Sequence, residues 1–363
     1  MIEFSAPLPF NIEHIDYLYK SNLLVNKSKI TSLYSCLPIN SDETCGFEQS
    51  RVETHEKMNF KDLAIFINHA KDKGFEFVYL INSPKPFDTS KKDLNLQLDK
   101  LSNLLKNLKK IGCFSLRVTN TQLMLYITNN FPEFKIYAST SQEYFSIKQY
   151  QNLFKKFSNI KEVLPSVEQT KNFMFLKNLR KLFPNIDVEL ILNEACMGGC
   201  PFRVHHSLIT SSLPLSEYRQ YDKNYLEMCT QVSSSDVYLY ICRLNTIYPW
   251  DIFEYTKIGV NKFKFVGRNA PIFRTGAYMK IYRDYMLGVD NPSYLDKMPF
   301  RYLNHYIVGR QDFNYTVEQI RPYLPSIKHF LKNGHLCHSM CGIDCLYCYN
   351  CADKMRKKYP EMS

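Results

Sequence analysis

A chain of 363 residues in which 45% are hydrophobic and 22% are charged can bury a full core, which excludes an intrinsically disordered class. No stretch approaches the roughly 18 consecutive apolar residues of a membrane helix, and the first residues lack the basic and apolar segments of a secretory signal. We therefore expect a cytoplasmic protein without membrane contact. The formal net charge of +11 leaves an RNA partner open, although the lysines are scattered along amphipathic segments rather than clustered.

Short β-rich runs alternate with longer amphipathic runs along the chain. In order, the expected strands are 3–5, 31–35, 75–82, 113–118, 135–139, 162–164, 187–192, 237–241 and 262–266. The expected helices between them are 60–73, 94–110, 121–129, 142–157 and 169–182. This alternation, without a glycine-rich phosphate loop, favours an α/β fold with a TIM-barrel-like parallel barrel, and a doubly wound open sheet is the alternative.

The pattern weakens after residue 278. The segment 315–332 is expected to form one or two short helices interrupted by Pro322 and Pro325. We assign residues 1–284 to the barrel domain and residues 285–363 to a C-terminal extension that ends in a cysteine-rich, metal-binding tail. In such a barrel the reacting groups lie at the carboxyl ends of the strands.

The first cysteine group begins directly after the expected strand 187–192. Cys196 and Cys200 are four residues apart, and the two glycines between them permit a tight loop whose N–H groups can approach a cluster sulfur. Cys229 and Cys242 can complete four thiolates. Four thiolates suit a 4Fe-4S cluster or zinc, and the number of ligands does not separate the two.

Polar residues expected at the same edge of the barrel supply the other candidate groups. Arg203 presents a planar, permanently charged fork for a carboxylate or phosphate, and a histidine such as His206 can transfer protons near neutral pH. A surface salt bridge for Arg203 and a hydrogen-bonding role for the histidine are the alternatives. The expected catalytic residues are His206, Arg203, Arg268 and Glu194, and the expected substrate-binding residues are Arg117, Asn193 and Lys264.

The second cysteine group lies close to the C-terminus. Its members are Cys337, Cys341, Cys345, Cys348 and Cys351, all within fifteen residues. The C-x2-C-x2-C spacing at its end is typical of ferredoxin-type cluster sites. Zinc that stabilises a short segment is the alternative. In a reducing compartment, such crowding indicates metal binding rather than a disulfide framework.

Two segments resemble the peptidase U32 (collagenase-like protease) family. Asn193-Glu-Ala-Cys-Met-Gly-Gly-Cys-Pro-Phe-Arg-Val-His-His206 is similar to the family's Asn-Glu-Gly-Cys…Cys-Pro-x-Arg-x-x-His segment. Tyr248-Pro-Trp-Asp251, followed by Ile258-Gly-Val-Asn-Lys-Phe-Lys-Phe-Val-Gly-Arg268, is similar to its Arg-Pro-Glu-Asp and Ile-Gly-Ile-Asp-x-Phe-Lys-x-x-Gly-Arg stretch. Tyr248 stands in place of an arginine, Ala195 in place of a glycine, and the cysteine spacing departs from that of the best-known hydroxylases, which bears on the substrate more than on the cluster.

The resemblance covers about residues 1–280 in element order and implies a TIM-barrel-like domain with an oxygen-sensitive 4Fe-4S cluster after the seventh strand. It also implies hydroxylation of tRNA, 23S rRNA or a quinone precursor without O2, with prephenate as an acidic co-substrate. We therefore expect an iron–sulfur enzyme that modifies RNA, a small molecule or a peptide, with a second cluster or zinc at the tail; a partner subunit is left open. The alternatives are a U32-type peptidase and a non-catalytic, zinc-stabilised module that binds RNA or protein.

Overall fold

The structure is a computed structural model of the whole chain. It describes residues 1–8, 10–23, 28–38, 41–48, 58–87, 90–194, 196–212, 235–267, 282, 292–303, 314–337 and 340–362. None of the helices in these ranges is long and apolar enough to cross a membrane.

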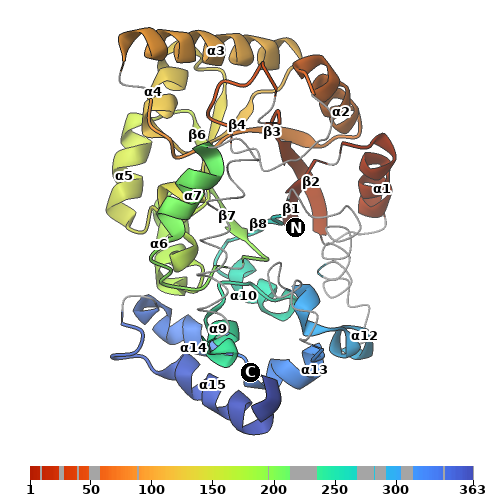
Figure 1. Cartoon of the computed structure of the whole chain (residues 1–363), viewed down its shortest axis with the longest axis vertical. Helices are drawn as coiled ribbons and strands as arrows, with labels where there is room; N and C mark the ends of the chain where they lie inside the picture. The colour runs from red at the N-terminus through yellow and green to blue at the C-terminus, as the bar shows by residue number, and fades with distance from the viewer. Residues whose placement is uncertain are drawn as a thin grey trace.

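Eight parallel strands close into a barrel in chain order (Figure 1). They are β1 Ile2–Pro7, β2 Ser28–Ser35, β3 Glu76–Ile81, β4 Ser115–Val118, β5 Lys135–Ala138, β6 Ile160–Val163, β7 Asp187–Ile191 and β8 Lys262–Lys264. β8 closes the barrel because it pairs with both β1 and β7: Lys264 lies opposite Ser5, and Lys262 lies opposite Glu189. The TIM-barrel-like fold predicted from the sequence is confirmed.

The helices that follow the strands begin where the sequence supplies a capping side chain. Asn59, Ser90, Asn120, Ser146 and Asn172 each accept a hydrogen bond from a backbone N–H in the first turn of the next helix. These helices are α2 Phe60–Asp72, α3 Lys91–Lys110, α4 Thr121–Asn130, α5 Ile147–Lys156 and α6 Phe173–Leu182. The Ser146 cap starts α5 five residues later than the predicted 142, and α1 Ile12–Leu23 was not predicted.

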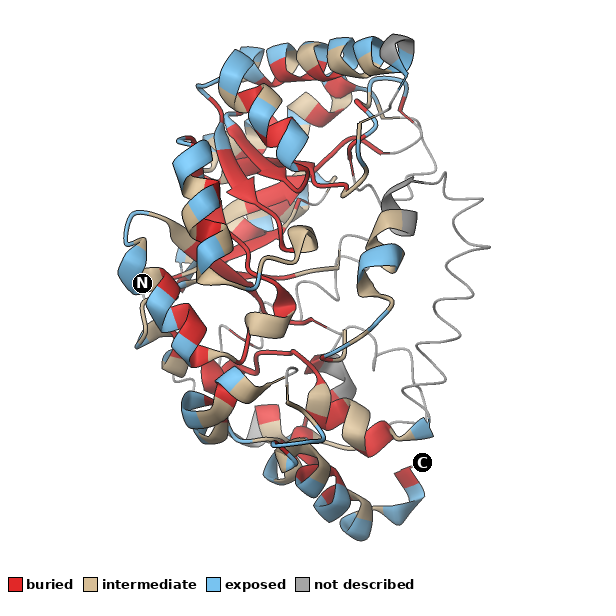
Figure 2. Ribbon diagram, turned by 90° about the vertical axis from the view of Figure 1, so that its left-hand side faces the viewer, coloured by how far each residue is buried: buried red, intermediate tan, exposed pale blue. Residues whose placement is uncertain are grey.

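Alternation along the strands separates an apolar layer from a charged interior. In β8 the ring of Phe263 is fully buried and contacts Tyr255 of α10 Ile252–Thr256, whereas Lys262 and Lys264 on either side of it are polar. Because successive side chains of a strand point to opposite faces, the two lysines face the inside of the barrel. Figure 2 shows the same division on the helices, whose buried stripes face the strands and whose exposed stripes face outwards.

One predicted strand is wrong. Residues 237–241 belong to the helix α9 Val237–Arg243, which begins where the Asp236 side chain accepts a hydrogen bond from the backbone N–H of Leu239. Its buried residues are Val237, Tyr238, Ile241 and Cys242, a helical spacing. A short apolar run of five residues fits a buried strand and a buried helix equally well by periodicity, and here the cap and the packing decide for the helix.

The C-terminal helices pack on the barrel beside α6 and α9 (Figure 1). They include α12 Pro292–Lys297, α13 Val317–Ile320, α14 Ile327–Asn333 and α15 Tyr347–Lys358, the last of which was not predicted. The two short helices expected in 315–332 are found, with Pro322 and Pro325 between them. The predicted domain boundary at 284/285 lies outside the described residues.

Candidate active site at the barrel mouth

The segment that follows β7 is fixed to the end of β8 and to the chain after α9. Asn193 is fully buried, and its carboxamide donates to the carbonyl of Val266 and accepts from the Val266 N–H, both at 2.8 Å. Thr246 donates its hydroxyl to the carbonyl of Glu194 at 2.8 Å. Asn193, predicted to bind substrate, therefore uses both its carboxamide oxygen and its carboxamide nitrogen to join the end of β7 to the end of β8. Glu194 is held at the carboxyl end of β7, as predicted from the strand order.

Backbone N–H groups of the loop that joins Cys196 to Cys200 donate hydrogen bonds to two carboxylates and one backbone carbonyl. The Cys196 N–H donates to Glu194 Oε1 at 2.8 Å, and the Gly198 N–H donates to the Arg243 carbonyl at 3.1 Å. Gly199, at a φ of +74°, donates its N–H to both carboxylate oxygens of Glu168 at 3.0 and 3.1 Å. The glycine N–H groups expected to approach a cluster sulfur thus bond to protein oxygens instead.

Arg203, the first residue of α7 Arg203–Ser212, is clasped between two carboxylates. Its Nε lies 2.7 Å from Glu143 Oε1, and its Nη2 lies 3.6 Å from Glu194 Oε2. Burial alone would lower the pKa of this guanidinium, but Glu194, Cys196 and Glu143 together raise it above its ordinary value. Arg203 therefore stays charged and ties α7 to the segment after β7.

Glu143 is a residue of the site that sequence reasoning missed. It follows η1 Thr140–Gln142, adopts a left-handed backbone with a φ of +53°, and also accepts a hydrogen bond from Ser166. A left-handed backbone is unfavourable for a residue with a side chain, so the ion pair with Arg203 helps to hold it there. The signal available in the sequence was its place shortly after the fifth strand, which is one of the strand ends that form the mouth.

Cys196 and Cys200 lie at this mouth as half-buried thiols. Burial, and then the nearby Glu194 carboxylate, raise the pKa of the Cys196 thiol. On α7, His205 is exposed and His206 is half-buried. Cys229 and Arg268 lie outside the described residues.

Cys242 does not accompany Cys196 and Cys200. It is buried on α9, with its Sγ 3.9 Å from the carbonyl oxygen of Tyr323 in the C-terminal extension. Burial raises the pKa of its thiol, and Cys351 and Cys348 of α15 raise it further. The structure therefore places Cys242 towards the tail cysteines, whereas the prediction grouped it with the barrel cysteines.

Arg117 lies inside the barrel below the mouth and bridges two strands across the interior. Its Nη2 is 2.7 Å from Glu162 Oε1 on β6 and 2.7 Å from Glu189 Oε2 on β7. All three side chains are almost completely buried. The Arg117 Nε and Nη1 have no hydrogen-bond partner within the described part of the chain. Arg117, predicted to bind substrate, thus has two carboxylate partners and spare donors.

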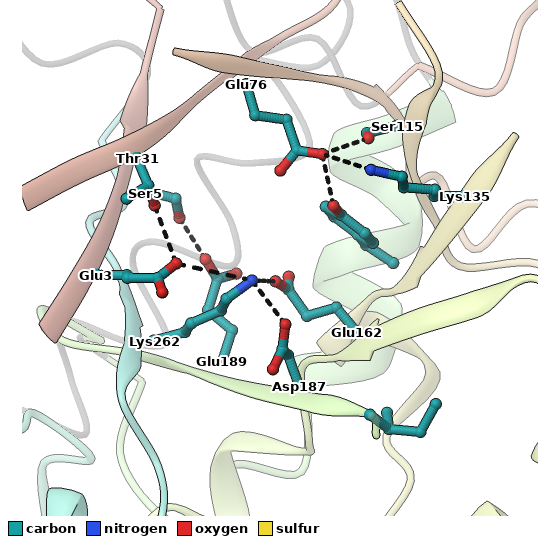
Figure 3. A network of polar contacts seen from close by, with 12 residues as sticks. Glu3, Ser5, Thr31, Glu76, Ser115, Lys135, Glu162, Asp187, Glu189 and Lys262 are labelled. Atoms are coloured by element: carbon teal, nitrogen blue, oxygen red, sulfur yellow. Dashed lines mark hydrogen bonds and ion pairs between the residues drawn. The ribbon is translucent and has the colours of Figure 1, made fainter. Parts of the chain in front are cut away.

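The same interior holds the two lysines of β8, and Figure 3 shows one of them, Lys262, beside Glu162 and Asp187. Lys262 lies 2.8 Å from Asp187 and 3.2 Å from Glu162, and the Nζ of Lys264 lies 3.7 Å from the centre of the Tyr34 ring. Burial, and then repulsion by Glu189, raise the pKa of Glu162 to about 7. Burial would also raise the pKa of Glu189, but Arg117 and Lys264 outweigh it and hold that pKa below its ordinary value.

The tail cysteines lie on α15 and in the chain just before it, and α15 packs against α9. Cys345 and Cys351 are buried, and Cys337, Cys341 and Cys348 are half-buried. Within the described ranges, no three histidine, cysteine or acidic side chains already converge on the position of a single metal ion.

Comparisons with known proteins were made for sequence and for structure. No protein-family model matches the chain. Over 270 residues, which are 72% of this chain and 78% of the relative, the sequence is 24% identical to the Methanocaldococcus jannaschii protein named uncharacterized protease MJ1657. This similarity supports the resemblance to the U32 family that the two motif segments indicate.

Solved structures with a similar arrangement are enzymes of low sequence identity. The U32 peptidase Mk0906 is 8% identical, with a TM-score of 0.46 over 75% of this chain and 94% of that chain. N-acetylneuraminate lyase from Fusobacterium nucleatum is 12% identical, with a TM-score of 0.39 over 99% of each chain.

Proposed function

We propose that this chain is a U32-type enzyme whose reaction takes place at the barrel mouth, where Cys196 and Cys200 would hold part of an iron–sulfur cluster. The observation that carries the proposal is the position of these two half-buried thiols directly after β7, in a loop fixed by Glu168 and Glu194. The carboxyl ends of the strands are where barrel enzymes react.

The donors suit a thiolate-bound cluster. Two cysteine thiols lie together at the mouth, and Cys229 in the segment between α7 and α9 is the third candidate ligand. Cys242 is turned towards the tail, so we do not assign it to this site. When bound, a cluster of this kind would supply one-electron chemistry at the mouth.

The protein residues of the mouth position the loop and hold its charge. Glu143 and Glu194 fix Arg203, and Arg203 in turn fixes the first turn of α7, from which His206 projects. This order fits a division of roles in which Arg203 is a positioning residue and His206 moves a proton to or from the substrate. Because Glu143 and Glu194 already pair with the Arg203 guanidinium, Arg203 is less available to bind an anionic substrate than predicted.

The proposed reaction is oxygen-independent hydroxylation, or a related modification, of RNA, a small molecule or a peptide, with an acidic co-substrate such as prephenate. Among the described side chains of the mouth, the carboxylates of Glu143, Glu168 and Glu194 outnumber the guanidiniums of Arg203 and Arg243. A dicarboxylate needs further positive charge, and we assign that role to Arg268, which follows β8 in the sequence.

A peptidase is the rival function because the Methanocaldococcus relative carries the name of a protease. A cysteine nucleophile acts as the thiolate and needs a lowered pKa. Burial and the Glu194 carboxylate raise the pKa of Cys196 instead. The environment of this thiol therefore favours a role as ligand to a metal over a role as free nucleophile, because the positive charge of the metal would offset the cost of burying the thiolate.

The proposal is tested by anaerobic purification of the wild-type protein and of two serine variants. Iron and sulfide in near-equal amounts, with an electron paramagnetic resonance signal after reduction, are expected for the wild type. Cys196→Ser should lose the barrel cluster, while the matched variant Cys113→Ser, at a buried thiol of the barrel wall, should retain it. Turnover is then measured on RNA and small-molecule substrates with and without prephenate under anaerobic conditions.

Two results would contradict the proposal. One is a colourless wild-type protein that contains zinc and no sulfide. The other is Cys196→Ser protein that keeps all of its metal and loses a proteolytic activity shown by the wild type.

A further inference from the structure

The tail cysteines lie on α15 and in the short turns before it. Cys337 follows the 3-10 turn Gly334–Leu336, Cys341 and Cys345 lie in the turn before α15, and Cys348 and Cys351 lie on α15 itself. Cys348 and Cys351 are three residues apart on α15, so they lie on one face of the helix. The tail therefore gathers its thiols on a folded scaffold rather than along an extended strand.

A tight turn presents the other thiols to this face. Cys341 and Cys345 form a β-bridge, and Gly342, at a φ of +82°, donates its N–H to the Cys345 carbonyl at 3.1 Å. The Cys345 Sγ lies 3.7 Å from His329 Nε2, and the His329 ring stacks on Tyr347 with the ring centres 3.7 Å apart. A compact turn before a helix, with cysteines in both, is a common way to build a thiolate metal site.

A sixth thiol reaches the tail from the barrel side. Cys242 lies on α9, which packs against α15, and its Sγ is 3.9 Å from the carbonyl oxygen of Tyr323. It lies 95 to 109 residues before the tail cysteines in the sequence. A metal that takes Cys242 together with tail thiolates would join the barrel to its extension.

A buried cation stands beside these thiols. Lys171 is almost fully buried; its Nζ donates to the Leu244 carbonyl at 2.6 Å and lies 4.8 Å from the centre of the Phe330 ring. Lys171 and Cys242, together with Phe330, line the same small cavity. An ammonium group in this position can offset the negative charge of a thiolate-bound metal centre.

We propose that Cys242, Cys348 and neighbouring tail cysteines hold a second thiolate-bound metal centre, separate from the barrel mouth, which fastens the C-terminal extension to the barrel. Both an iron–sulfur cluster and zinc bind cysteine thiolates, and this shared chemistry is what the six thiols supply. The centre adds to the proposed function of the mouth and does not depend on it, because Cys196 and Cys200 belong to neither α9 nor α15.

The test is metal and sulfide analysis of anaerobically purified full-length protein and four serine variants. Cys348→Ser and Cys242→Ser should each lose the same share of metal, about half of the iron if both centres are 4Fe-4S clusters. Cys196→Ser should lose only the remaining share, and Cys113→Ser should lose none. Iron with sulfide identifies a cluster in the tail, and one equivalent of zinc that is missing only in the tail variants identifies a zinc site.

A second measurement separates metal loss from misfolding. If the centre fastens the extension, Cys348→Ser and chelator-treated wild type should both become sensitive to proteolysis after β8, while the circular dichroism of the barrel persists. The proposal is overturned if Cys348→Ser retains all metal. It is also overturned if Cys242→Ser loses its metal in common with Cys196→Ser and not with Cys348→Ser. If Cys196→Ser keeps all of its metal, the proposed mouth cluster is refuted. The results for Cys348→Ser and Cys242→Ser still decide whether the tail centre exists.

Discussion

Replacing Arg117 by methionine removes the only guanidinium that touches both Glu162 and Glu189 inside the described barrel. The Arg117 Nη2 lies 2.7 Å from an oxygen of each carboxylate, and all three side chains are nearly inaccessible to water. Methionine keeps much of the side-chain volume, so the loss is chiefly that of the charge. Removing one partner of a buried ion pair leaves an uncompensated buried charge, which costs about 3–5 kcal/mol of unfolding free energy.

The cost should depend on pH because the two carboxyl groups can accept protons. The pKa of Glu162 is already raised to about 7, so its contribution to stability is present below its ordinary pKa and is lost as pH rises through about 7. Arg117 lowers the pKa of both carboxyls, and its removal raises both. The deficit of the Arg117→Met variant is therefore largest at about pH 8 and shrinks towards about pH 5, because protonation of Glu162 in the folded protein removes one of the two buried negative charges that Arg117 offsets.

The assay is urea unfolding of the wild type and the variant at about pH 5 and about pH 8. The matched control is Lys109→Met, which removes a cation that lies 2.6 Å from Glu133 at the surface and should cost less than about 1 kcal/mol at both pH values. A deficit for Arg117→Met that is no larger than that of the control would refute the reasoning. So would a large deficit of equal size at the two pH values.

Three further substitutions test the tail, the mouth and a buried acid. Gly334→Ala places a Cβ 1.9 Å from the Lys171 carbonyl oxygen, so the extension should detach and its proteolysis should accelerate. Asn193→Ala leaves the N–H and carbonyl of Val266 unpaired and should cost about 1–3 kcal/mol in urea unfolding. Burial raises the pKa of Asp251 to about 7, so its stabilising effect is lost as pH rises through about 7; Asp251→Asn should raise stability at about pH 8 more than at about pH 5, and an equal effect would contradict this.

Much of the barrel follows from local sequence. Capping residues such as Asn120 and Ser146 start helices at defined positions, and alternation in Lys262-Phe263-Lys264 marks a strand with one apolar and one polar face. The order of these elements is enough to place the segment after residue 192 at the carboxyl end of the barrel. Local pattern failed at 237–241, because a run of five residues is too short for its periodicity to separate strand from helix.

The sequence by itself determined the barrel, the position of Cys196 and Cys200 at its mouth and the crowding of thiols in the tail, because these depend on neighbours along the chain. Only the tertiary structure decided which distant groups meet. It paired Glu143 with Arg203 across 60 residues, set Arg117 between two glutamates on other strands, and turned Cys242 towards the tail. Such contacts depend on how helices and strands pack, and no local pattern specifies them.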